Sequence, residues 1–70
     1  MRLAPEDDAI ARQALNRVVE RAQAANESTD IEAAIANLMS TRDAIVAAAL
    51  TLRAVADNAR AKAIRTVEHA

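Results

Sequence analysis

Apolar residues in the first part of the chain recur every three or four positions, the spacing of one face of an α-helix. Pro5 precedes this stripe and is followed by three acidic residues. Proline fits the first helical position because it lacks the N–H that would be unpaired there, and acids favour the positive end of the helix dipole. The pattern predicts a helix over about residues 5–26, with a stripe of Ile10, Ala11, Ala14, Leu15, Val18, Val19, Ala22 and Ala25.

A second apolar pattern starts at Ile31, after a polar stretch over residues 26–30. Thr29 and Glu32 have the spacing of a capping box, in which the Thr29 hydroxyl caps the helix and Glu32 reaches back. We therefore expect a loop over about residues 27–29 and a second helix over about residues 30–68. Positions 31, 35, 38, 42, 45, 49, 52, 56, 59 and 63 follow a near-heptad spacing and hold aliphatic or alanine side chains, except at Arg42.

Two polar pairs are candidate breaks in this second helix. Ser40-Thr41 is one, because Asp43 has the spacing to complete a second capping box, and Asp57-Asn58 is the other. Neither contains the glycine or proline that a sharp break prefers, so one continuous helix is favoured. A break at Ser40-Thr41 would instead give a three-helix bundle with a short middle helix.

Composition favours helix throughout the chain. Glycine is absent and 20 of the 70 residues are alanine, so strands and tight turns have almost nothing to build on. A short loop holds consecutive helices antiparallel. We predict an all-α fold over residues 1–70 as one domain: an antiparallel helical hairpin, with a short first and a long second helix, that assembles into a homo-oligomeric helical bundle.

The register of this hairpin points to a partner chain. Centring it on residues 28 and 29 places Val18 near Leu38 and Leu15 near Arg42, so the first helix would end opposite about Leu52. The apolar stripe from residue 55 onward would then lack cover from the same chain. Residues 45–52 are apolar nearly all round, which is typical of a helix buried on several sides. We expect an oligomer, with a dimer favoured, whose interface comprises Ile45, Ala49, Leu52, Val55, Ala56, Ala59 and Ile64.

The size of the available core supports the same expectation. The chain has no aromatic residue, so few large side chains are available for burial. A chain of 70 residues buries a small share of its surface and is marginal without a disulfide, a metal or a partner. Cysteine is absent, so oligomerisation is the remaining common remedy.

The sequence contains no residue pattern typical of a catalytic, cofactor-binding or metal-binding site. Without glycine, the chain can form no phosphate-cradling loop, dinucleotide fingerprint or nucleophile elbow. The one histidine, His69, is the penultimate residue and lacks the spacing of a bundle metal site. We interpret the hydroxyls of Ser28, Thr29, Ser40 and Thr41 as helix caps. We expect no catalytic residue, metal or cofactor, and no enzyme activity.

Charge is almost balanced overall, at −1, but the last part of the chain is basic. Arg42 interrupts the apolar stripe; it either pairs with Asn16, Glu20 or an acid of another chain, or extends its long stem to water. The candidate residues for an acidic partner or a phosphate backbone are Arg53, Arg60, Lys62 and Arg65.

The pattern favours a small homo-oligomeric helical protein that binds another macromolecule as a regulator, inhibitor or adaptor. The alternatives are an RNA- or DNA-binding hairpin dimer that uses the C-terminal basic residues, and a small-ligand site at an inter-chain seam. We expect a cytoplasmic protein, because the acidic start does not fit a secretory signal and the longest apolar run, residues 44–50, is too short to span a bilayer. Its arginine- and alanine-rich composition fits a GC-rich bacterial or phage gene.

Overall fold

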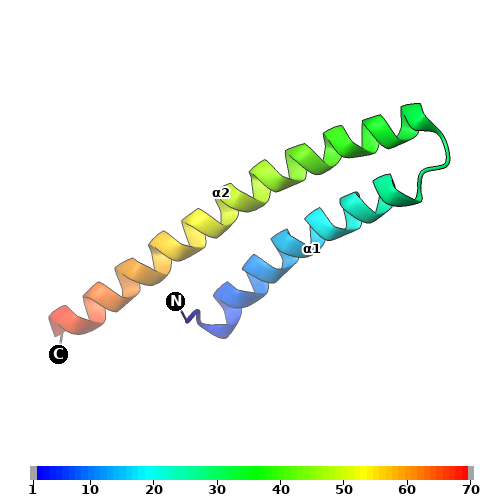
Figure 1. Cartoon of the computed structure of the whole chain (residues 1–70). Coiled ribbons are helices and arrows are strands. Elements are labelled where there is room, and N and C mark those ends of the chain that lie inside the picture. The colour runs from blue at the N-terminus through cyan, green and yellow to red at the C-terminus, as the bar shows by residue number, and fades with distance from the viewer. Residues whose placement is uncertain (1, 70) are drawn as a thin grey trace.

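A computed structural model describes residues 2–69, with the side chains of residues 2–65. Two α-helices, α1 (Pro5–Glu27) and α2 (Ile31–His69), lie side by side and run in opposite directions (Figure 1). The molecule is a rod with extents of 59 × 17 × 13 Å. The prediction of an all-α hairpin with a short and then a long helix is confirmed, and both helices begin and end within one residue of the expected positions.

Helix α2 is continuous, so the alternative of a three-helix bundle is wrong. Neither Ser40-Thr41 nor Asp57-Asn58 interrupts it. The Thr41 hydroxyl donates to the Asn37 carbonyl at 2.7 Å, one turn earlier in the same helix. Thr41 therefore satisfies its hydroxyl within the helix and does not cap a new one.

The turn between the helices is capped by residues next to those expected. Asp30, and not Thr29, caps α2: its Oδ2 accepts from the Ala33 N–H at 3.0 Å. The prediction was one residue early because α2 begins at Ile31, and a cap bonds to the third residue of its helix. Ser28 ends α1, with its N–H donating to the Ala25 carbonyl at 3.3 Å and its hydroxyl to the Ala24 carbonyl at 2.8 Å.

The register of the hairpin differs from the predicted one, by about one helical turn at Arg21 and by more at Asp7. Arg21 Nη1 donates to Ser40 Oγ at 2.8 Å, and Lys62 Nζ lies 3.4 Å from Asp7 Oδ2. Helix α1 therefore reaches far beyond Leu52 along α2. The expectation that the stripe after Leu52 lacks cover is wrong at Val55, which is only 8% exposed.

Small and polar side chains set this register. The buried hydrophobic residues are Ala11, Ala48 and Val55, and no large side chain among the described residues is fully buried. The side of α2 that faces α1 carries buried or half-buried residues at heptad spacing, and not the stripe predicted to pack there. Small residues let two helix backbones approach closely. This inner row comprises Ala34, Asn37, Thr41, Ala44, Ala48, Thr51 and Val55.

Candidate interaction face

The large aliphatic side chains lie mostly outside the hairpin. Exposed positions reach 63% at Leu50 and 72% at Ile31. A folded monomer normally buries side chains of this size, and a contiguous exposed set marks an interaction site. The exposed large residues are Ile10, Leu15, Val19, Ile31, Ile35, Leu38, Met39, Ile45, Val46, Leu50 and Ile64.

Two heptad rows alternate along α2 and explain this arrangement. Ala34, Thr41, Ala48 and Val55 form the row that faces α1, and each is buried or half-buried. Three residues before each of them stands a larger aliphatic residue, which is exposed or half-buried. Helix α2 therefore turns small side chains toward α1 and large ones to its flank. This outer row comprises Ile31, Leu38, Ile45 and Leu52.

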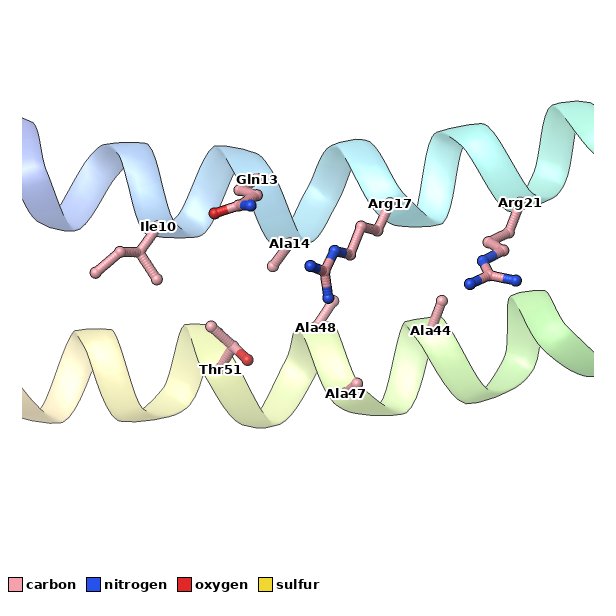
Figure 2. Close-up of a pocket in the computed structure, with 9 residues that line it drawn as sticks. All are labelled: Ile10, Gln13, Ala14, Arg17, Arg21, Ala44, Ala47, Ala48 and Thr51. Atoms are coloured by element: carbon pink, nitrogen blue, oxygen red, sulfur yellow. The ribbon is translucent and has the colours of Figure 1, made fainter.

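Helix α1 adds to the same flank of the hairpin. A groove of about 270 Å³ runs along the other flank, where Arg17 and Arg21 of α1 reach toward Ala44 and other small residues of α2 (Figure 2). Successive residues of a helix point about 100° apart, so a residue that follows a half-buried groove residue, one turned toward the other helix, lies toward the opposite flank. Leu15 follows Ala14 in this way, and Ile45 and Leu52 follow Ala44 and Thr51. We call the set Leu15, Val19, Ile31, Ile35, Leu38, Ile45 and Leu52 the aliphatic face.

The residues predicted for an oligomer interface divide into three groups. Ile45, Ala49 and Ile64 are exposed, whereas Leu52, Ala56 and Ala59 are half-buried between the helices and solvent. Val55 packs against α1 and is not available to a second chain. The interface itself stays a prediction.

The prediction also omitted the part of the aliphatic face nearest the turn. Ile31, Ile35 and Leu38 are among the exposed side chains. Their signal was present in the sequence, because they continue the near-heptad stripe that contains Ile45. They were assigned to α1 because large aliphatic residues were expected to pack within the hairpin.

Arg42 lies on the exposed side of α2 with its guanidinium 3.5 Å from the neighbouring Asp43 carboxylate. Neither Asn16 nor Glu20 of α1 contacts it. Its side chain is 64% exposed, which matches a long stem that extends to water. Arg42 therefore does not determine the register within the hairpin.

The four C-terminal basic residues do not form one cluster. Arg60 lies 3.3 Å from Asp57 on the same helix, and Lys62 pairs with Asp7 across the hairpin. Arg53 and Arg65 are exposed. Arg53 and Arg60 share one side of α2 by their seven-residue spacing, whereas Lys62 lies on the side of Asp7.

Asp7 is a buried carboxylate in the first turn of α1. Its side chain is 9% exposed and accepts from Lys62 Nζ. The acids at residues 6–8 were predicted to favour the helix N-terminus, but the sequence did not reveal that one of them joins the two helices. The contact between Asp7 and Lys62 depends on the register of the two helices, and the register predicted from the sequence was wrong.

Of the requirements of a metal site and of a membrane span, the described residues meet only the second. No group of three potential metal-binding side chains occurs among the described residues, and the His69 side chain lies outside them. Helix α2 is long and apolar enough over Ile31–Arg65 to cross a membrane, judged by length and composition alone. The cytoplasmic location stays a prediction.

Comparison of the chain with protein-family models, with curated proteins and with solved structures finds no match.

Proposed function

We propose that the chain is a small homo-oligomeric helical protein, a dimer, that binds another macromolecule as a regulator, inhibitor or adaptor. The observation that carries this proposal is the aliphatic face, where large side chains such as Ile45 and Leu38 are half or more exposed. Burying a large aliphatic side chain completely contributes roughly 1.5–3 kcal/mol. A second chain is the source of burial that a protein of this size most often uses.

The hairpin alone has a thin core. The buried hydrophobic residues are two alanines and Val55, and of the other large aliphatic side chains that the structure describes only Leu3, Val18 and Leu52 are half-buried. Ordering the chain costs roughly 1–2 kcal/mol per residue for the backbone, which such a core offsets poorly. Self-association through the aliphatic face would supply the large side chains that the seam between α1 and α2 lacks.

A dimer still leaves surface for a further partner. Ile10 and the groove beside Arg17 and Arg21 lie on the flank opposite the aliphatic face. Leu50 also remains exposed, at a position turned away from Ile45. Protein is a better partner than nucleic acid, because the chain has no aromatic side chain for base stacking and two of its four C-terminal basic residues pair with its own acids.

Purification of the tagged full chain from its native host tests the binding function. We expect one protein to co-purify in fixed stoichiometry, to survive nuclease treatment and moderate salt, and to be lost in the Ile10→Glu variant. Asp43→Lys, which is an exposed charge change outside the groove, is the control and should retain the partner. Recovery of nucleic acid alone, or of no stoichiometric partner, contradicts the proposal.

A further inference from the structure

We infer that the second copy packs antiparallel on the aliphatic face, with the two-fold axis level with Ile45 and Leu15. This inference rests on the proposed dimer and specifies its geometry. Helix α2 then packs on α2 of the second copy, and α1 on α1 of the second copy. Four helices at the corners of a square result, which is a common form of the four-helix bundle.

Side-chain size along α2 favours this axis. With Ile45 opposite Ile45 of the second copy, Leu38 lies opposite Leu52 of the second copy. Farther from the axis, Ile31 lies opposite Ala59 of the second copy and Ile35 opposite Ala56. The half of α2 near the turn supplies large side chains and the other half supplies small ones. An antiparallel pair therefore matches large with small in the outer layers, as close packing requires.

Arg42 fits the same arrangement. It interrupts the stripe, and the antiparallel register places it opposite Ala49 of the second copy. A small residue there leaves room for the arginine stem, and the guanidinium already lies at the exposed edge beside Asp43. In a parallel pair, Arg42 would instead face Arg42 of the second copy.

Charge selects the antiparallel orientation. Glu32 and Arg60 are separated by four heptads, and both are exposed. Because the heptad row from Ala34 to Val55 stays turned toward α1, α2 supercoils, and residues four heptads apart lie on the same side. The antiparallel register brings Glu32 beside Arg60 of the second copy, twice by symmetry. In a parallel pair, Glu32 and Arg60 of the second copy would instead lie about 42 Å apart along the helices and could not meet. Like charges across an interface are unfavourable and complementary ones fix orientation.

Helix α1 agrees with this axis. Ala14 of α1 lies near the level of Ala48 of α2 along the groove (Figure 2). The helices are antiparallel, so Leu15 lies within about one helical turn of the level of Ile45. A two-fold axis at that level brings Leu15 toward Leu15 of the second copy. The central layer of the bundle then contains Leu15 and Ile45 from both copies, four large side chains that the isolated hairpin leaves 40–51% exposed.

Disulfide mapping tests this geometry, because the chain has no cysteine of its own. The variant Ile31→Cys/Ala59→Cys is oxidised in the assembled state and digested with trypsin, which places the two cysteines in peptides 22–42 and 54–60. The two sites are about 42 Å apart along one helix, so they cannot pair within one chain. We expect peptide 22–42 linked to peptide 54–60 as the main product.

The control variant Ala36→Cys/Ala54→Cys places its cysteines in the same two peptides but on the side of α2 turned away from the aliphatic face. We expect at least tenfold less crosslinked product from it. Main products that join 22–42 to 22–42 and 54–60 to 54–60 would show a parallel pair and overturn the inference. Equal crosslinking of the control would overturn it as well, as would a dimer without any crosslink.

A charge exchange gives a second readout that does not depend on cysteines. Glu32→Arg should raise the dimer Kd about fivefold, and Glu32→Arg/Arg60→Glu should restore it, because exposed ion pairs contribute up to about 1 kcal/mol. Circular dichroism confirms that each variant is folded. Failure of the restoration contradicts the antiparallel register. If the unmodified chain is monomeric in water and co-sediments with phosphatidylcholine vesicles, lipid occupies the face, and the proposed function fails with the inference.

Discussion

Lys62 Nζ lies 3.4 Å from Asp7 Oδ2 and joins the first turn of α1 to α2 across 55 residues of sequence. The contact holds the first turn of α1 against α2, and it closes the end of the hairpin opposite the turn. The Asp7 carboxylate is almost completely buried, whereas the Lys62 ammonium is half exposed. Solvent therefore screens the pair in part, and its contribution is moderate.

Asp7→Asn should lower the free energy of unfolding by roughly 1–2 kcal/mol, because it removes the charge that pairs with Lys62 from a buried position. Asp8→Asn is the matched control: Asp8 lies in the same turn but is exposed, and its pair with Arg12 spans 3.8 Å. We expect the control to cost about 0.5 kcal/mol or less. Urea unfolding at one fixed protein concentration measures both. Equal losses for the two variants would show that the helix dipole, and not Lys62, explains the role of Asp7.

Ala48→Leu should destabilise the hairpin by about 1–3 kcal/mol, because Ala48 is buried between the helices and a larger side chain forces them apart. Ala36→Leu adds the same atoms at an exposed position of α2 and should leave stability within about 0.5 kcal/mol. Thermal unfolding followed by circular dichroism compares the two. A stable Ala48→Leu protein would contradict the close contact of small residues along the seam.

Ile45→Asp should dissociate the dimer, because it places a charge at the centre of the aliphatic face. Leu50→Asp is the control, since Leu50 is 63% exposed and Ile45 is 51% exposed, yet Leu50 lies off that face. Sedimentation velocity should show a dimer for Leu50→Asp and a monomer or an unfolded chain for Ile45→Asp. The opposite pattern would move the interface to the other side of α2.

The chain should not bind nucleic acid tightly. Of the four C-terminal basic residues, Arg60 and Lys62 pair with acids of the same chain, and Arg53 lies on another side of α2 from Lys62. Phosphate contacts make affinity fall steeply with salt. We expect elution from a heparin column below physiological salt, with no further change in Arg53→Ala. Strong retention that is lost as salt rises and reduced by Arg53→Ala would favour the RNA- or DNA-binding alternative.

The sequence predicted the helices well because their signals are local. Pro5 begins α1, the polar stretch after it forms the turn, and the absence of glycine keeps α2 continuous through Ser40. The predicted cap was Thr29, whereas Asp30 caps α2. Both residue types cap helices, and only the position where α2 begins decides between them.

The register and the faces were harder to predict, because a heptad pattern does not say which of two adjacent rows a neighbouring helix covers. Large residues such as Leu38 and Ile45 were expected to pack on α1, but Thr41 and Ala48 pack there. Close contact of the helices through small side chains competed with the burial of large ones, and the small side chains pack between the helices. The resulting register brings Asp7 to Lys62. The aliphatic face was consequently visible in the sequence as a stripe but not as an exposed surface.

Sedimentation equilibrium of the unmodified chain at low micromolar concentration is the most direct test of this account. We predict a mass of twice the 7.5 kDa monomer, because the aliphatic face needs a second copy to cover Leu15, Leu38 and Ile45. A folded, monodisperse species of 7.5 kDa at tens of micromolar would contradict it.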